Sequence, residues 1–217
     1  MIEDERIGLY IHSLDRDLSE KLRTIEKEAL EDEVPIIKKS TQGLLRFLVN
    51  MKKPQHILEV GCAVGFSAVL MSEAMPEGGH ITTIEKVPQR IKKAKENFVF
   101  AEKQEAITLL EGDATDILKK LVAEKKQYDM IFMDAAKGQY LNFFDDILQL
   151  LKKDGLLVSD NVLQDGDIVE SRYAIKKRNR TIHSRMREYL YTLTHHEALD
   201  TVILPMGDGV TLSTKLK

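Results

Sequence analysis

From residue 56 to residue 159, short apolar runs alternate with longer amphipathic stretches. The alternation predicts strands at 57–60, 80–84, 106–110, 128–133 and 156–159, and helices at 67–74, 88–101, 116–123 and 139–152. Strands separated by helices imply an α/β fold, a mostly parallel sheet with helices on both faces. Ligands of such sheets gather at the carboxyl ends of the strands, so the residues after each strand say most about function.

The two flanks of this unit have different patterns. Residues 1–53 are predicted to form a helical extension, because Leu18, Leu22 and Ile25 recur at helical spacing between charges. Residues 201–204 and 210–213 enclose Met206-Gly207-Asp208-Gly209, which predicts a closing hairpin. We expect residues 1–217 to form one domain in which residues 54–217 are the ligand-binding core.

Charge and cysteine content exclude several classes of protein. The net charge is −3, so a nucleic-acid partner would have to be held by a local basic patch. Cys62 is the single cysteine, which rules out an intramolecular disulfide and suits a reducing compartment. No apolar stretch is long enough for a signal peptide or a membrane span. The expected setting is the cytoplasm, without a membrane partner.

A glycine-containing loop follows the first predicted strand. Glu59, Gly61, Gly65 and Ser67 lie in it, with Gly61 suited to a tight turn and Gly65 to close approach of a ligand. The spacing is Gly-x-x-x-Gly, which differs from the Gly-x-Gly-x-x-Gly of dinucleotide sites and argues against a nicotinamide dehydrogenase. Glu59 could meet a cationic amino group. Such a glycine pair is also common in simple turns.

Acidic residues follow the next two strands. Glu85 ends the second strand and could bind both hydroxyls of a ribose. Asp113, followed by Ala114, comes after the third strand and could accept from an adenine amino group. Each acid alone is more often a helix cap. Partners for an amine, a ribose and an adenine in chain order together indicate S-adenosylmethionine.

Oxygen-bearing side chains end the fourth and fifth strands. Asp134 ends the fourth, with Lys137 three residues on, and Asp160 and Asn161 end the fifth. Carboxylate and amide oxygens suit Mg²⁺, although calcium and manganese also fit. Either motif alone would be interpreted as a turn or as a helix cap. Their occurrence after adjacent strands favours a metal site, and Asp134 also lies within reach of the cofactor.

These motifs together resemble the class I, cation-dependent O-methyltransferases that include the caffeoyl-CoA and catechol O-methyltransferases. The resemblance covers residues 34–217 and rests on residues 59–67, 85, 112–114, 129–137, 140, 160–161 and 204–211. It implies a Rossmann-like, seven-stranded sheet with an antiparallel last strand. It also implies that Asp134, Asp160 and Asn161 bind the metal, that Lys137 is catalytic beside Asp134, and that the protein is a homodimer.

A basic segment, residues 172–187, follows the metal motif. Seven of its sixteen residues are Lys or Arg and none is acidic, which indicates a polyanionic substrate such as RNA or an acyl-CoA. The candidate RNA-binding residues are Arg172, Lys176, Lys177, Arg178 and Arg180. A solvated helix face is the simpler interpretation.

The acceptor hypotheses follow from this segment and from the predicted metal. 5-Hydroxyuridine carries adjacent oxygens that could chelate a metal once the base leaves the stack. Over its whole length the chain resembles the bacterial tRNA 5-hydroxyuridine methyltransferases, which implies the wobble position of a tRNA anticodon loop. A small-molecule O-methyltransferase acting on catechols or hydroxycinnamoyl-CoA esters is the alternative. An RNA-binding protein without catalysis is disfavoured because the metal and cofactor residues are all present.

Overall fold

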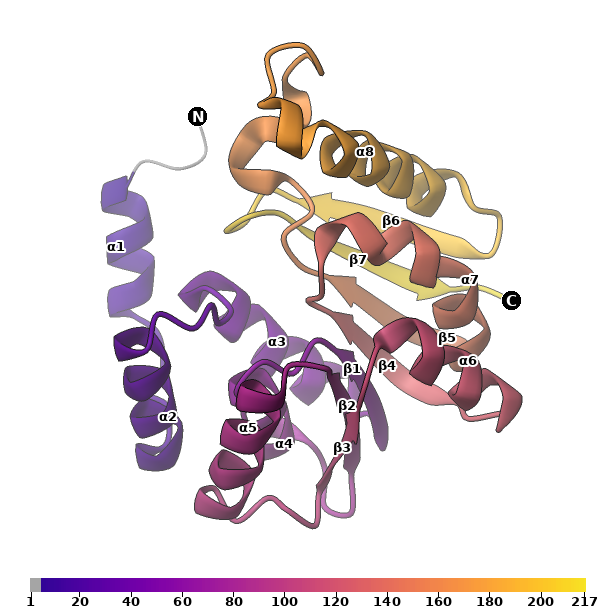
Figure 1. Ribbon diagram of the computed structural model, residues 1–217. Helices are drawn as coiled ribbons and strands as arrows, with labels where there is room; N and C mark the ends of the chain where they lie inside the picture. Colours follow the sequence, from indigo (N-terminus) through magenta and orange to yellow (C-terminus); the bar gives the residue numbers. More distant parts are fainter. Residues whose placement is uncertain (1–4) are drawn as a thin grey trace.

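The computed structural model describes residues 5–217 (Figure 1). The predicted helical extension consists of helices α1 (Glu5–Ser13), α2 (Glu20–Glu31) and α3 (Lys39–Lys52). Its first four residues lie outside the described part of the chain. Ser19 starts α2 by accepting a hydrogen bond from the backbone N–H of Leu22, as a helix-capping serine does.

The predicted alternation of strands and helices is confirmed. The strands are β1 (His56–Val60), β2 (His80–Glu85), β3 (Ile107–Glu111), β4 (Tyr128–Met133), β5 (Leu151–Ser159), β6 (Leu199–Leu204) and β7 (Val210–Lys215). The helices are α4 (Phe66–Ala74), α5 (Pro88–Phe100), α6 (Ala114–Ala123), α7 (Tyr140–Leu150) and α8 (Arg180–His195). Three short 3-10 helices are η1 (Lys137–Gln139), η2 (Gln164–Val169) and η3 (Lys177–Asn179).

The seven strands form one sheet in the order β3-β2-β1-β4-β5-β7-β6. β7 runs antiparallel to both neighbours, whereas the pairs from β3 to β5 are all parallel. The expected mixed sheet, with an antiparallel last strand and a closing hairpin, is therefore present. This order puts the carboxyl ends of β1 to β5 along one edge, with those of β3 and β5 at opposite ends of the row.

β5 differs from its predicted bounds. It starts at Leu151, five residues early, and α7 accordingly ends at Leu150. The turn expected to precede the strand, Lys153-Asp154-Gly155, lies inside it as an irregularity in the pairing with β4. Asp154 has a φ of +60°, so the chain loops out there and then rejoins the ladder.

Two apolar cores cover the two faces of the sheet, and the helices of each face can be followed in Figure 1. One core joins the sheet to α2, α3, α4 and α5, and the other joins it to α6, α7 and α8. Leu22, Ile25 and Leu45 belong to the first core and are at most 1% exposed. Each such side chain contributes about 1.5–3 kcal/mol to folding, so α2 and α3 are integral to the packed core.

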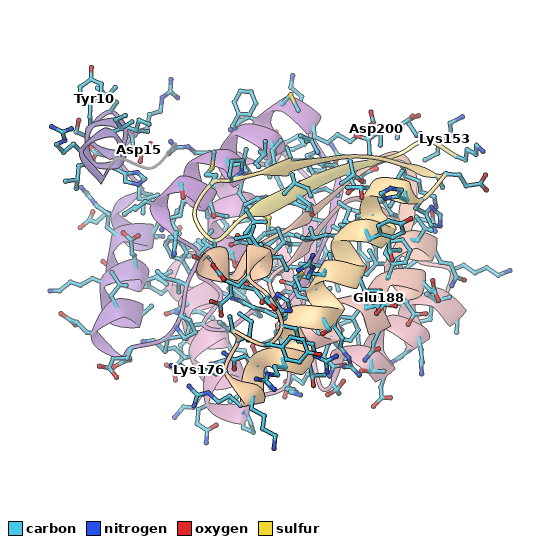
Figure 2. All side chains as sticks on the ribbon, turned by 90° about the horizontal axis from the view of Figure 1, so that it is seen from above. Tyr10, Asp15, Lys153, Lys176, Glu188 and Asp200 are labelled. Carbon is cyan, nitrogen blue, oxygen red and sulfur yellow. The ribbon has the colours of Figure 1, made fainter. Side chains whose placement is uncertain are left out.

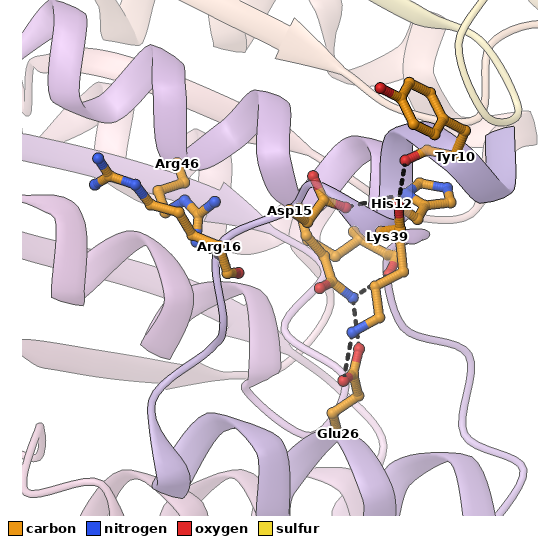
Figure 3. Close-up of polar contacts among 10 residues, drawn as sticks. Tyr10, His12, Asp15, Arg16, Glu26, Lys39 and Arg46 are labelled. Atoms are coloured by element: carbon orange, nitrogen blue, oxygen red, sulfur yellow. Dashed lines mark hydrogen bonds and ion pairs between the residues drawn. The ribbon is translucent and has the colours of Figure 1, made fainter. Parts of the chain in front are cut away.

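Polar contacts fix the start of α3 against α2 (Figure 3). The Glu26 carboxylate accepts hydrogen bonds from Lys39 at 2.7 Å and from the buried Gln42 at 2.8 Å. Arg46 reaches the carbonyl oxygen of Arg16 at 3.4 Å, in the connection between α1 and α2. These contacts set the path of residues 34–38, which we call the strap. In residues 5–217 we find no helix with the length and apolarity needed to cross a bilayer.

Candidate active site

A cavity of about 720 Å³ opens along the carboxyl ends of β1 to β5, within the size range of small-molecule sites. Its wall includes residues 60–63, 84–87, 112–115, 134–137 and 160–161, each group following one of these strands. Residues 35–38 of the strap and Asp208, in the β6–β7 turn, also line it. The expectation that the residues after each strand meet at one site is thus fulfilled by the geometry.

The two glycines of the first loop have different roles. Gly61 lines the cavity with a φ of +107°, and a Cβ there would lie 2.0 Å from the carbonyl oxygen of Asp134. Gly65 is not part of the cavity wall; its φ is +83° and a Cβ would lie 2.4 Å from the Phe98 ring. Gly65 therefore allows α4 to pack on α5, a different role from the ligand approach expected of it.

Glu59 lies behind the wall of the cavity. It is fully buried, and its carboxylate accepts hydrogen bonds from the hydroxyls of Ser67 and Thr83. Burial raises the pKa of Glu59 to about 7, against the lowering effect of these two hydrogen bonds. Ser67, in contrast, lines the cavity itself. A ligand amine would meet Ser67 first, with the Glu59 carboxyl group behind it.

Glu85 and Asp113 line the cavity and are both held by backbone donors. Glu85 accepts from the N–H groups of Ala63 at 2.9 Å and Lys86 at 2.8 Å, which ties the ends of β1 and β2 together. Asp113 caps α6 by accepting from Thr115 at 2.9 Å, and these bonds lower its pKa. Asp113 thus serves as the helix cap that the simpler interpretation gave, while Ala114 beside it also faces the cavity.

Asp134, Asp160 and Asn161 meet at the other end of the cavity. The Asn161 side-chain nitrogen donates to Asp134 at 2.9 Å, and the Asn161 backbone N–H donates to Asp160 at 2.8 Å. Burial, together with the smaller effect of the nearby Asp134 charge, raises the pKa of Asp160 to about 7. Burial also raises the pKa of Asp134. Two neighbouring carboxylates with raised pKa values favour binding of a cation between them.

The donor set fits a hard cation that keeps several waters. Within residues 5–217, no three His, Cys, Asp or Glu side chains are grouped as a metal site. The fit depends instead on two carboxylates and the amide oxygen of Asn161. A rotation of the Asn161 side-chain amide by 180° would turn its oxygen, instead of its N–H group, toward Asp134. The orientation of an amide follows its hydrogen-bond partner, so a bound cation would favour this rotated form. Mg²⁺ binds through few protein oxygens, so these three suffice.

Lys137 and Tyr140 support this end of the site. Lys137 lines the cavity from η1, and its charge lowers the pKa of both Asp134 and Asp160. The hydroxyl of Tyr140 lies 3.1 Å from the carbonyl oxygen of Met133 and 3.0 Å from that of Asp160. Tyr140 therefore fixes the ends of β4 and β5 relative to each other.

Several residues of the cavity wall were not singled out from the sequence as site residues, among them Lys38 and Asp208. Lys38, in the strap, forms an ion pair with Asp208, 170 positions later in the chain. Both line the cavity. Asp208 lies in a segment that had been interpreted as a hairpin turn, and the sequence around Lys38 carries no motif. Their pairing depends on tertiary structure alone.

The basic segment lies beside the cavity without lining it. Arg172, Lys176, Lys177 and Arg178 are exposed, and Figure 2 shows Lys176 far from Asp200 at the opposite end of α8. The guanidinium of Arg180 donates to the carbonyl oxygens of residues 175 and 173, at 3.1 and 3.2 Å, and so closes its own loop. The guanidinium of residue 185 donates to the carbonyl of residue 138, in η1, at 2.8 Å. The segment therefore adjoins the Lys137 side of the site.

The sheet order and the position of the cavity define the chain as a Rossmann-like O-methyltransferase by fold. A structure from Bacillus cereus, an O-methyltransferase in complex with SAH, superposes with a TM-score of 0.86 over 97% of both chains at 19% identity. A Staphylococcus aureus protein, provisionally described as a caffeoyl-CoA O-methyltransferase, is 30% identical, with a TM-score of 0.85 and 97% coverage of both chains.

Sequence comparison gives the family. A catechol O-methyltransferase of Niastella koreensis is 32% identical over 169 residues, which cover 76% of each chain. The family model described as O-methyltransferase matches residues 11–216. The chain belongs to the O-methyltransferase family.

Proposed function

We propose that this protein transfers a methyl group from S-adenosylmethionine to an acceptor oxygen held on a divalent cation. One observation carries the proposal. Asp134, Asp160 and Asn161 meet at one end of a cavity that extends past Gly61 to Glu85 and Asp113. A cofactor that lies along the strand ends would point its methyl group toward an acceptor at the β4 and β5 end.

The residues at the β1 to β3 end suit the three parts of the cofactor. Ser67, with Glu59 behind it, would meet the amino group of the methionine part. Glu85 accepts three backbone hydrogen bonds, two on Oε1 and one on Oε2, so Oε2 retains a lone pair for a ribose hydroxyl. Asp113 and Ala114 line the place for the adenine. The SAH bound to the Bacillus cereus relative supports this choice of cofactor.

The residues at the β4 and β5 end suit an acceptor with two adjacent oxygens. Mg²⁺ at this end would lower the pKa of a bound hydroxyl and fix its direction. Asp134, Asp160 and Asn161 would hold the cation, and Lys137 would offset the negative charge of the deprotonated acceptor oxygen. The close contact of Gly61 with the Asp134 carbonyl fixes the first loop relative to the end of β4, which would help to hold the methyl donor and the acceptor in line.

A small molecule with adjacent oxygens is the first candidate acceptor. The names of the relatives from Niastella koreensis and Staphylococcus aureus favour catechols or hydroxycinnamoyl-CoA esters. A cavity of about 720 Å³ has room for a cofactor and a ring-sized acceptor.

5-Hydroxyuridine at the wobble position of a tRNA is the second candidate, and the basic segment favours it. Its cationic side chains are exposed outside the cavity, where they would meet a backbone of phosphates more readily than a small ring. Replacing Lys176, Lys177 and Arg178 by Glu should weaken tRNA binding and reduce its salt slope by about one per lost phosphate contact. Glu at the exposed Lys125 and Lys126, after α6, is the matched control.

One assay separates the two candidates. The protein is incubated with labelled S-adenosylmethionine and Mg²⁺, with either a catechol or tRNA from cells lacking the protein, and each reaction is repeated with EDTA. Label in 5-methoxyuridine that EDTA abolishes supports the tRNA acceptor, and label in the catechol alone supports the small-molecule acceptor. Transfer that persists in EDTA contradicts the role of the cation.

We also propose that the protein forms a homodimer through α1. This helix carries Ile7, Leu9, Tyr10 and Ile11, and Leu14 follows its last residue; each of these side chains is more than half exposed. The helix stands apart from the sheet in Figure 1. Exposed apolar side chains in one helix mark an interaction surface. Light scattering should give twice the chain mass of 24.7 kDa, and Glu at Ile11 and Leu14 should give the monomer. A monomeric wild-type protein contradicts the proposal.

A further inference from the structure

The ion pair between Lys38 and Asp208 joins two distant segments at the wall of the cavity. The Asp208 side chain is 14% exposed, whereas that of Lys38 is 54% exposed. Both residues face the same cavity as Asp134 and Asp160. An ion pair in this position places one extra negative and one extra positive charge beside the proposed cation site.

Asp208 is held in place by the loop that follows the candidate metal ligands. The N–H of Leu163 donates to the carbonyl oxygen of Asp208 at 2.8 Å, and that of Val162 donates to Gly209 at 3.0 Å. Gly209 packs so closely that a Cβ there would lie 2.2 Å from the Leu163 side chain. Asp208 is therefore fixed relative to Asp160 and Asn161, which follow β5.

Lys38 is held from the other side of the cavity. It immediately precedes α3, whose first turn is bonded to Glu26 of α2 through Lys39 and Gln42. The strap therefore presents Lys38 to Asp208 from a firmly packed helix. Loss of the Lys38 charge would leave Asp208 in position with its negative charge less compensated.

Asp208 faces the same cavity as both candidate carboxylates, from a turn whose backbone is bonded to residues 162 and 163, next to Asn161. Asp208 thus makes this end of the cavity more negative, and Lys38 opposes it.

We propose that Asp208 and Lys38 are opposed positioning residues that set the affinity of the site for its divalent cation. Asp208 attracts the cation and Lys38 limits that attraction, which allows the ion to be released with the product. The inference rests on the proposed metal role of Asp134, Asp160 and Asn161.

The test of the pair is the affinity for Mn²⁺ alone, measured by calorimetry without cofactor or acceptor. Substitutions of Asp208 and of Lys38 should change this affinity in opposite directions. Asp208→Asn should weaken Mn²⁺ binding by about tenfold, and Lys38→Met should strengthen it by about threefold, because the exposed lysine is more screened. The double variant should bind within about threefold of wild type, since the two charge changes cancel. Lys27→Met is the matched control, because Lys27 is an exposed lysine that pairs with Glu31 and is not part of the cavity wall.

The possible outcomes separate this inference from the proposed function. Wild-type protein that binds no divalent cation contradicts the metal site itself. Wild-type binding with unchanged affinity in Asp208→Asn, or weaker binding in Lys38→Met, overturns the role of the pair alone. Lys38 is exposed, so Lys38→Met should fold and give a decisive result even if Asp208→Asn loosens the turn.

Discussion

The acidic residues at the two ends of the cavity differ in what surrounds them. At the cofactor end, Glu85 and Asp113 accept hydrogen bonds from the backbone, and the carboxylate of Glu59 accepts from two hydroxyls. At the acceptor end, Asp134 and Asp160 lie beside each other, and burial raises the pKa of both. Both carboxylates of the acceptor end also accept a hydrogen bond from Asn161, but they lie close enough that the charge of Asp134 raises the pKa of Asp160. The two ends therefore differ in the mutual repulsion of their carboxylates.

This difference assigns distinct tasks to the two ends. Hydrogen-bonded carboxylates are ready to orient a ligand without rearrangement. Buried neighbouring carboxylates destabilise a protein unless a cation or a proton lies between them. The buried carboxylates of the acceptor end therefore lower the stability of the metal-free protein and favour cation binding. Substitutions of these carboxylates should affect stability and activity differently.

The largest expected effect comes from removing a carboxylate at the acceptor end. Asp134→Ala or Asp160→Ala should lower methyl transfer at least about a thousandfold, because the cation contributes several kcal/mol to the barrier. Asp160→Asn should raise the melting temperature of the metal-free protein while abolishing activity. Asp145→Asn, on the exposed surface of α7, is the control. Wild-type turnover in either alanine variant under strict metal control would remove the residue from the site.

Lys137→Met should have the next largest effect. We expect kcat to fall about a hundredfold, since the variant lacks the charge that faces the acceptor oxygen. The dissociation constant of S-adenosylmethionine should not change, because Lys137 lies at the other end of the cavity. Steady-state kinetics and calorimetry measure the two quantities. A loss of cofactor affinity with normal kcat would move Lys137 to the cofactor end.

Gly61→Ala tests the contact between the two ends. A Cβ at Gly61 would lie 2.0 Å from the Asp134 carbonyl oxygen, and Gly61 has a φ of +107°. We expect a loss of about 3 kcal/mol in the free energy of unfolding, from backbone strain and overpacking together. Gly78→Ala is the matched control, because Gly78 has a φ of +78° and nothing within 4 Å of a Cβ; its expected cost is about 1 kcal/mol. Equal losses in urea denaturation would contradict the close contact.

The smallest effect concerns the pH dependence of stability. The pKa of Glu59 is raised from 4.5 to about 7, so the native state holds a proton that the unfolded chain releases. The free energy of unfolding of the metal-free protein should therefore fall as pH rises from about 5 to about 7 and then level off. Glu59→Gln should remove the part of this fall that comes from residue 59. An unchanged profile in the variant would mean that Glu59 is ionised throughout.

The sequence predicted those parts of the fold that depend on local pattern. Burial periodicity and turn residues located the strands, and the acids after β2 to β5 could be named because parallel strands bring their carboxyl ends together. The sequence did not separate the packing role of Gly65 from the lining role of Gly61, since both follow the same strand. That difference comes from Phe98, more than thirty positions away.

Long-range contacts account for the remaining differences. The pairing of Lys38 with Asp208 joins segments 170 residues apart, and no periodicity in the sequence predicts it. Arg180 was predicted to be an RNA-binding residue of the basic segment, yet its guanidinium closes its own loop. The early start of β5 depends on its alignment with β4, which tolerates a loop at Asp154. Each of these features is decided by what packs against the segment.

Anomalous diffraction from crystals soaked in Mn²⁺ would locate the cation directly. We expect one strong peak at roughly 2.0–2.3 Å from side-chain oxygens of Asp134, Asp160 and Asn161, with the Asn161 amide turned to present its oxygen. The same soak of Asp160→Asn should give no peak. A peak elsewhere in the wild-type protein, or none at this end of the cavity, would contradict a methyl acceptor held on a metal ion.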